Sequence, residues 1–209
     1  MKIARDGLKF ILPALLLALV FLAFGWWPLS GLFLILSGAL VFFFRDPERV
    51  PPPGDGRLVA PADGRVLAIE SPAARSGLDS PATRVTIFLS LLDVHVTRAP
   101  VSGTVGQVEY RAGKFLPAYR PEAGEHNESC ALDIRGGPVD IHLRQIVGVA
   151  ARRIKCFVKP SDRLVRGQRL GVMLFGSRVE LDLPTGVEIK VRLNEKTRAG
   201  ESVIAEVKT

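Results

Sequence analysis

Side chains that usually carry metal, redox or nucleotide chemistry are scarce in this chain. Its 209 residues include only two cysteines and three histidines, and their spacing fits no metal site. The sequence has no P-loop, no dinucleotide-binding fingerprint, no G-x-S-x-G elbow of a serine hydrolase and no nucleic-acid-binding motif. We therefore expect no metal and no nucleic-acid partner, and the enzyme classes that those motifs identify are excluded.

The two cysteines, Cys130 and Cys156, are far apart in the sequence. A reducing compartment requires no disulfide between such residues, and a small buried side chain is the usual role of a free cysteine. We expect both residues to be structural and buried.

Acidic residues are fewer than basic ones, 21 against 28, which gives a formal net charge of +7. A basic protein attracts either nucleic acid or anionic lipid. Because nucleic-acid motifs are missing and the chain carries a long apolar segment, we expect an anionic membrane surface as its partner. Each basic residue near such a surface contributes about 1 kcal/mol.

Charged side chains are almost absent from residues 8–44, where Lys9 is the only one. Two apolar runs lie there, Phe10–Phe24 and Leu29–Phe44, and roughly 17–20 residues suffice to cross the hydrocarbon layer as a helix. The intervening residues 25–28, Gly-Trp-Trp-Pro, combine helix breakers with the aromatic type that anchors at a membrane interface. We expect a transmembrane or membrane-embedded helical hairpin, and the sequence leaves open whether the first, shorter run spans the bilayer.

The hairpin is expected to occupy residues 1–45. A cleavable signal peptide does not fit, because a second apolar run follows the first in place of an A-x-A-like cleavage site and a polar mature sequence. Basic residues on both sides of the hairpin place both of its ends in the cytoplasm. These residues are Lys2, Arg5, Lys9, Arg45, Arg49 and Arg57. We therefore expect the inner membrane as the location, with the rest of the chain on its cytoplasmic side.

Proline and glycine are dense in residues 46–58, which we interpret as a linker to a domain of residues 59–209. In that domain, short apolar or alternating runs such as GRVLAIE and SVIAEVK recur between Gly, Pro and Asp, which predicts an all-β sandwich or barrel. Two pairs of half-motifs echo each other, as in biotinyl- and lipoyl-like domains. The expected fold is mainly β: a biotinyl/lipoyl-like (hammerhead-type) β-sandwich preceded by the helical hairpin.

The segment Gly171–Leu183, GVMLFGSRVELDL, is predicted to be a strand, yet a Gly-Ser pair interrupts it. Glycine weakens a strand interior and usually marks a bulge, a bend or a close backbone approach. His95 follows another apolar strand, and Asp63 lies in a Pro-x-Asp-Gly turn. Taken alone, turn geometry accounts for Asp63 and a structural hydrogen bond for His95. We expect His126 and His142 to be surface or structural residues.

Six motifs in a fixed order connect these residues: VAPADGRV, FLSLLDVHVTRAPVSGTV, HNES, ARRIKCFV, LVRGQRLGVMLFGSRVELDLP and KTRAGESVIA. In this order they resemble phosphatidylserine decarboxylase proenzymes, and the short form with a membrane hairpin is the most similar. The resemblance covers nearly the whole chain, including FRDPERVPP after the hairpin. The Phe-Gly-Ser-Arg-Val core, together with the other motifs, is specific for this family, although each motif alone is not.

The resemblance implies that the chain cuts itself between Gly176 and Ser177, which gives a large chain, residues 1–176, and a small chain, residues 177–209. In that family the serine hydroxyl attacks the glycine carbonyl, the resulting ester is eliminated, and the serine becomes an N-terminal pyruvoyl group. This covalent group forms a Schiff base with the amine of phosphatidylserine and delocalises the carbanion left by carbon dioxide. The implied product is phosphatidylethanolamine, and no PLP is required.

The motif positions also imply site residues. Asp63 is expected to orient His95, and His95 to act as the base during maturation and as the proton donor afterwards. Longer relatives carry a second histidine where this chain has Arg98, which cannot act as a base, so the base for self-cleavage is left open. Arg98 is a candidate for binding the substrate phosphate or carboxylate. Asn127 and Glu128 are candidate substrate-binding residues, although the arginine that usually follows Asn-Glu is missing.

Two other functions also fit the sequence. The first is the same chemistry on a related lipid with a serine headgroup, such as archaetidylserine. The second is a non-catalytic, membrane-tethered lipoyl-like adaptor, which would leave the Gly-Ser pair without a purpose and which lacks a lysine at a hairpin tip. The sequence leaves open the acyl-chain preference and the oligomeric state, a homo-oligomer included.

Overall fold

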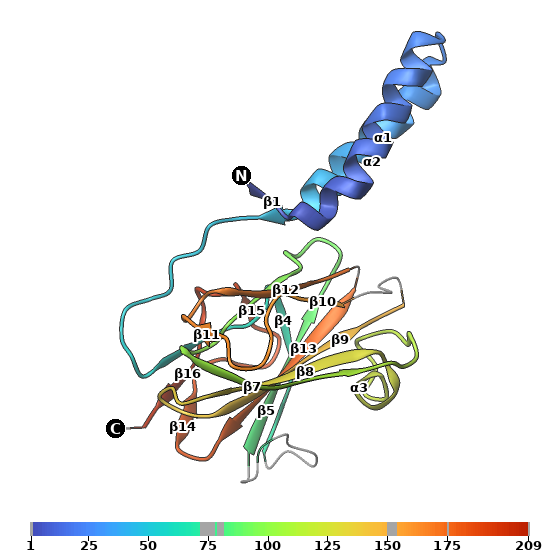
Figure 1. The fold of residues 1–209 in the computed structure, drawn as a ribbon. Coiled ribbons are helices and arrows are strands. Elements are labelled where there is room, and N and C mark those ends of the chain that lie inside the picture. Colours follow the sequence, from blue (N-terminus) through green and yellow to red (C-terminus); the bar gives the residue numbers. More distant parts are fainter. Residues whose placement is uncertain (1, 72–77, 79–81, 150–153, 175, 209) are drawn as a thin grey trace. The chain divides into compact units, whose positions relative to one another are not determined.

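The computed structural model describes residues 2–71, 78, 82–149, 154–174 and 176–208 (Figure 1). Internal contacts divide the chain into two units, Met1–Glu48 and Arg49–Thr209. The first unit is mainly helical, and the regular elements described in the second are strands and one short helix.

Two apolar helices form the first unit, α1 (Arg5–Ala23) and α2 (Trp27–Phe43), and they pack against each other (Figure 1). The hydroxyl of Ser30 donates a hydrogen bond of 2.9 Å to the carbonyl of Ala18 across the helix pair. Two short strands, β1 (Lys2–Ile3) and β2 (Arg45–Asp46), pair at the base of the hairpin. The predicted helix pair is confirmed, and α1 begins five residues before the apolar run.

Large apolar side chains cover the outside of the helix pair. Leu16 of α1 is 62% exposed and Ile35 of α2 is 74% exposed. α1 has 19 residues and a mean hydropathy of 2.0, long and apolar enough to cross a bilayer, whereas α2 is an apolar helix of 17 residues. This composition suggests membrane association. Full spanning by both helices and the side of the membrane stay predictions.

The second unit contains an antiparallel sheet of eight strands, the large sheet, which curls around the core (Figure 1). The strand β13, orange in Figure 1, is paired along its length with β9 on one side and β5 on the other. The order is β11 (Arg163–Leu164), β7 (Gly103–Arg111), β8 (Ser129–Arg135), β9 (Ile141–Val147), β13 (Ser177–Pro184), β5 (Ala82–Leu89), β4 (Gly64–Glu70) and β15 (Lys196–Thr197).

Two further antiparallel sheets of three strands complete the unit. The first, called here the small sheet, has the order β10 (Ile154–Cys156), β12 (Arg169–Met173) and β6 (Val96–Arg98). The second has the order β14 (Val187–Ile189), β16 (Val203–Val207) and β3 (Arg57–Val59). A single turn of helix, α3 (Ala123–His126), lies between β7 and β8 in the chain.

One apolar core joins the three sheets. It contains Ile87, Leu143 and Leu181 from the large sheet, Met173 from the small sheet and Ile204 from the third sheet. The prediction of a mainly β fold is therefore confirmed. The specific biotinyl/lipoyl-like hammerhead arrangement stays a prediction.

The Gly-Ser pair lies between two strands and not inside one. β12 ends at Met173 in the small sheet, and β13 begins at Ser177 in the large sheet. The prediction of one strand over Gly171–Leu183 was therefore wrong. Gly176 has a φ of +63°, a left-handed conformation that glycine adopts without strain, and the chain changes sheets at this point.

Candidate active site

Ser177 begins β13 in the middle of the large sheet, where it is paired with Leu89 and Val147. Alternate residues of a strand face opposite sides, and Val179 and Leu181 lie in the core, so the Ser177 side chain points to that inner face. The residue is fully buried, and its Oγ has no hydrogen-bond partner among the described residues. Because burying an unpaired hydroxyl costs about 1–3 kcal/mol, this group is an exception that calls for a function.

The carbonyl of Gly176 belongs to the peptide bond that precedes Ser177, and it lies against Gly148. A Cβ on Gly148 would sit 2.1 Å from the Gly176 oxygen and 3.1 Å from the Cβ of Ala118. The chain just beyond β9 therefore approaches this carbonyl as closely as a residue without a side chain allows. We call Gly148 and Ala118 the wall beside this carbonyl. Their packing restricts the directions in which the Gly176 carbonyl can point.

Asn127 holds this wall in place. Its Oδ1 accepts a hydrogen bond of 2.8 Å from the Leu116 N–H, and its Nδ2 donates bonds of 2.7 Å to the carbonyls of Leu116 and Val147. Val147 is the residue paired with Ser177. The next residue, Glu128, is buried, and its carbonyl accepts a bond of 3.1 Å from the Val147 N–H. These hydrogen bonds of both residues are with the backbone, and their role in binding substrate stays a prediction.

His95 lies beside the segment that leads to Ser177. Its carbonyl accepts a hydrogen bond of 3.0 Å from the N–H of Met173, the last residue of β12. Its ring Nδ1 lies 2.9 Å from the carbonyl oxygen of Asp93. His95 directly precedes β6, in which Thr97 faces the large sheet. The backbone of His95 therefore contacts the end of β12, the strand that precedes Ser177 in the chain, and action of the His95 ring on Ser177 stays a prediction.

Asp63 precedes β4, and its carboxylate is bound from two sides. The Ala199 N–H donates a bond of 2.7 Å to Oδ1, and Arg49 donates one of 2.8 Å to Oδ2. Burial raises the pKa of Asp63, the hydrogen bond from Ala199 and the charge of Arg49 oppose this shift, and the charge of Asp93 adds to it. Asp93 thus affects Asp63 through its charge and His95 through its carbonyl. Direct orientation of His95 by Asp63 stays a prediction.

Arg98 is buried, and its guanidinium donates a bond of 2.9 Å to the carbonyl of Gly167. Its Cδ would lie 2.9 Å from a Cβ on Gly200. In β6, Arg98 alternates with Thr97 and therefore faces away from the large sheet. The structure does not place Arg98 on the side of Ser177, and substrate binding by this residue stays a prediction.

The other two histidines lie elsewhere. His142 is half-buried on β9, and its Nδ1 lies 2.7 Å from the carboxylate of Asp133 on β8. His126 is exposed at the end of α3. These positions agree with the expected surface or structural roles.

Gln145 was not identified from the sequence. It is fully buried on β9 opposite Val179, and its Nε2 donates a bond of 2.7 Å to the hydroxyl of Thr97 in the small sheet. Its Oε1 has no hydrogen-bond partner within the described part of the chain. A glutamine at a buried position of an apolar strand was the available signal. Gln145 links the sheet that carries Ser177 to the strand that follows His95.

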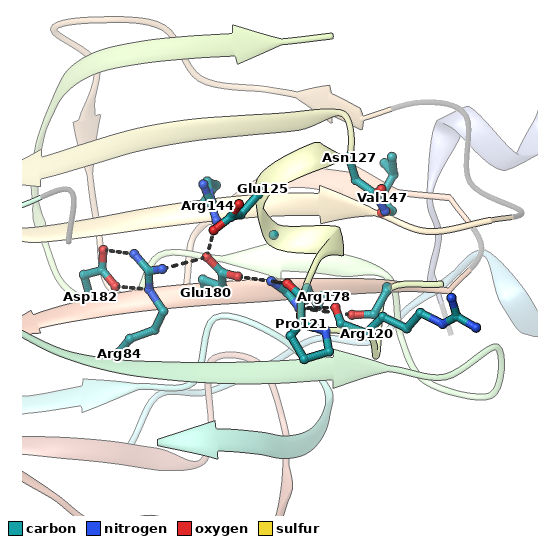
Figure 2. Close-up of polar contacts among 12 residues, drawn as sticks. Arg84, Arg120, Pro121, Glu125, Asn127, Arg144, Val147, Arg178, Glu180 and Asp182 are labelled. Atoms are coloured by element: carbon teal, nitrogen blue, oxygen red, sulfur yellow. Dashed lines mark hydrogen bonds and ion pairs between the residues drawn. The ribbon is translucent and has the colours of Figure 1, made fainter. Parts of the chain in front are cut away.

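The opposite, outer face of β13 carries ion pairs in place of an unpaired hydroxyl (Figure 2). Glu180 lies 2.6 Å from Arg144 and 2.5 Å from Arg178, and Asp182 pairs with Arg84 at 2.7 Å. Glu180 and Asp182 are almost completely buried, so the arginines are needed to compensate their charges. The hydrogen bond with Asp182 raises the pKa of Arg84, which keeps the pair ionised.

Arg178 extends this outer cluster to the wall around Gly176. Its guanidinium donates a bond of 2.9 Å to the carbonyl of Arg120 (Figure 2). It donates another of 3.4 Å to the carbonyl of Ala118. Ala118 in turn lies next to Gly148. Arg178 on the outer face thus contacts the segment that packs against Gly148.

A cavity of approximately 550 Å³ opens on the outer face, lined in part by Arg84, Arg144, Arg178 and Glu180. Its size would suit a ligand, but the Ser177 side chain points to the other side of the sheet. We therefore place the candidate active site at the junction of the large and small sheets and not in this cavity.

The residues at that junction fit a cofactor made from the chain itself. The Ser177 hydroxyl is buried and unpaired in the described structure, and it directly follows Gly176 in a left-handed conformation. No group of three His, Cys, Asp or Glu side chains able to hold a metal ion gathers within the described ranges.

Comparison with known proteins finds relatives that match almost the whole chain. The family model described as phosphatidylserine decarboxylase matches residues 36–205. A phosphatidylserine decarboxylase proenzyme of Geobacter sulfurreducens is 42% identical over 210 residues, covering 97% of this chain and 95% of its own length. Proteins with the same name from Desulfotalea psychrophila and Cereibacter sphaeroides are 37% and 43% identical, covering 98% and 97% of this chain and 96% and 89% of their own lengths. The chain therefore belongs to the phosphatidylserine decarboxylase family.

Proposed function

We propose that this protein is the proenzyme of a membrane-associated phosphatidylserine decarboxylase that cuts itself between Gly176 and Ser177 and then converts phosphatidylserine to phosphatidylethanolamine. The single observation that supports this most is the buried, unpaired hydroxyl of Ser177 directly after a left-handed Gly176. Membership of the family supplies the reaction class.

In the proposed self-cleavage, Oγ of Ser177 attacks the carbonyl carbon of Gly176, and the peptide nitrogen leaves as the ester forms. Glycine at the acyl position tolerates the left-handed backbone and leaves room for the tetrahedral intermediate, since no atom lies within 4 Å of a Cβ built there. His95 is proposed as the base that removes the hydroxyl proton. Asn127 and Arg178 support this step indirectly, because they hold the backbone around Gly148.

In the proposed decarboxylation, the pyruvoyl group derived from Ser177 supplies the electron sink that no standard side chain can provide. His95 is proposed to return a proton to the α-carbon after carbon dioxide has left. The position between two sheets excludes water, because the side chains around Ser177 belong to a continuous core.

The helix pair fits a substrate with two acyl chains. Such a lipid rarely leaves the bilayer, so the enzyme must reach the headgroup at the membrane surface. The exposed apolar side chains of α1 and α2 and the net charge of +7 favour an anionic membrane, and we propose the cytoplasmic side of the inner membrane.

Mass spectrometry of the purified full chain and of Ser177→Ala tests the proposal, together with carbon dioxide release from phosphatidylserine vesicles. We expect fragments of residues 1–176 and 177–209 from the wild type, with pyruvoyl at the new N-terminus, and one inactive unbroken chain from Ser177→Ala. The exposed serine variant Ser71→Ala is the matched control and should cleave normally. His95→Ala should stay uncut.

An unbroken wild-type chain would remove the enzymatic function and leave the adaptor as the better interpretation. Parallel assays with vesicles of another serine-headgroup lipid, archaetidylserine, determine the headgroup preference. We expect faster release of carbon dioxide from phosphatidylserine.

A further inference from the structure

The two cysteines meet where the large and small sheets touch. Cys130 is on β8 and is paired with Gln145, while Cys156 is on β10 and is paired with Gly171. Nε2 of Gln145 would lie 3.3 Å from a Cβ on Gly171, and that Cβ would lie 3.4 Å from Cα of Cys156. Since the direct partners of the two cysteines are in contact, and β10 packs against β8, the thiols come together across the junction. A hydrogen bond joins them.

The two thiols differ in access and in acidity. Cys130 is buried, whereas Cys156 is only partly buried, so the expectation that both are buried was wrong for Cys156. The hydrogen bond from Cys130 lowers the pKa of Cys156 to about 7, although burial and the charge of Asp162 oppose the shift. The same contact, with burial, raises the pKa of Cys130. The more accessible sulfur is therefore the better nucleophile.

We propose that Cys130 and Cys156 form an oxidisable dithiol, which a hydroperoxide converts into a disulfide between the large and small sheets. The Cys156 thiolate first attacks the peroxide, the O–O bond breaks, and the products are a sulfenic acid and an alcohol or water. The Cys130 sulfur then attacks the Cys156 sulfur, and the sulfenic oxygen leaves as water with the Cys130 proton. Two thiols lose two electrons to the peroxide, and one S–S bond forms.

The disulfide would join residues 130 and 156 covalently. It would thereby link the large sheet, which contains Ser177, to the small sheet, whose strand β6 follows His95. Both cysteines belong to residues 1–176, so the bond forms within one chain whether or not the chain is cut after Gly176. The proposal is therefore independent of self-cleavage and of decarboxylation.

Peroxide treatment of the full chain in detergent tests the proposal. We expect hydrogen peroxide to lower the mass of the segment that contains both cysteines by about 2 Da, the loss of two hydrogens, and dithiothreitol to reverse the change. A non-reducing digest should contain the peptides of Cys130 and Cys156 linked to each other. The midpoint of thermal unfolding should rise in the oxidised protein, because the cross-link restricts the unfolded chain.

Two single variants separate the roles. In Cys130→Ser, peroxide should leave a sulfenic acid on Cys156 that dimedone labels, since the resolving thiol is missing. In Cys156→Ser, the buried Cys130 should stay reduced. A wild-type protein whose Cys156 accumulates dimedone label, or whose thiols both survive peroxide that oxidises the urea-unfolded chain, overturns the proposal. This wild-type comparison decides the question even where a variant does not fold.

Discussion

The two faces of strand β13 carry opposite kinds of polar residue. On the inner face, Ser177 has a buried hydroxyl with no partner in the described structure, next to apolar residues. On the outer face, Glu180 and Asp182 are equally buried, but each is paired with arginine at 2.7 Å or less. One strand thus combines a buried hydroxyl without a partner and buried carboxylates that are each paired with arginine.

The two faces therefore differ in what burial of their polar groups costs the folded protein. A neutral hydroxyl can be buried unpaired at a cost of about 1–3 kcal/mol, which a folded domain tolerates at one functional position. A buried carboxylate without a partner costs more, so Glu180 requires its arginines. We therefore expect changes on the outer face to lower stability, and changes around the inner face to slow self-cleavage in a protein that still folds.

The largest expected effect on the outer face comes from Glu180→Gln. It removes the charge that Arg84, Arg144 and Arg178 share, and of these Arg84 keeps its ion pair with Asp182. We expect a loss of about 3–5 kcal/mol in the free energy of unfolding, measured by urea titration of the circular dichroism signal. The control is Glu188→Gln, which removes an exposed ion pair with Lys190 and should leave the urea midpoint unchanged. Equal losses in the two variants would contradict the role assigned to burial.

The next effect concerns Gly148, which packs against the carbonyl of Gly176. Gly148→Ala places a methyl group 2.1 Å from the Gly176 oxygen, so the carbonyl must move. Because a displacement of about 1 Å can cost a reaction 100-fold, we expect self-cleavage to be about 100-fold slower, followed by gel electrophoresis after synthesis. Gly38→Ala in α2, where a Cβ meets no atom within 4 Å, is the control and should cleave at the wild-type rate.

Local patterns predicted much of this fold. Alternation of apolar and charged residues in RVELDL identifies β13 as a strand, and its two faces follow directly from the alternation. Periodicity does not tell which sheet a strand joins, so Gly171–Leu183 was predicted to be one strand although the chain changes sheets at Gly176. The charges of Glu180 and Asp182 were visible too, but their partners Arg84 and Arg144 are distant in the sequence.

The candidate site was predictable only where a motif carried it. Gly176 and Ser177 came from the resemblance to a family, as did His95, whose carbonyl accepts a hydrogen bond from the last residue of β12. Gly148 gave no signal beyond one glycine after an apolar run, because a close backbone approach depends on tertiary packing. Gln145 could have been noticed, since a glutamine at a buried register of a strand requires a partner.

A smaller effect is expected from Asn127→Ala, which removes the hydrogen bonds to the backbone of Leu116 and Val147. The wall at Gly148 then keeps its own packing but loses one support, and we expect self-cleavage to be about tenfold slower. Asn127→Asp keeps the acceptor for the Leu116 N–H and loses the donor to Val147, so it should be nearly as slow. Cleavage at the wild-type rate in Asn127→Asp would show that the bond to Val147 has no part in positioning.

The smallest effect concerns Asp63, where burial and the favourable contacts with Ala199 and Arg49 act in opposite directions on one pKa. Since the net shift is upward, the folded state holds the Asp63 proton more tightly than the unfolded state does. The stabilisation that this proton provides is present below the ordinary pKa of 3.8 and is lost as the pH rises through the folded-state pKa.

Asp63→Asn removes this dependence, while Arg49 keeps its ion pair with Glu201 at 2.8 Å. Urea titrations of both proteins from acidic to neutral pH should therefore show the wild type losing stability relative to Asp63→Asn as the pH rises. A difference that grows in favour of the wild type would mean that the contacts with Ala199 and Arg49 outweigh burial, and that Asp63 resembles the compensated carboxylates of the outer face.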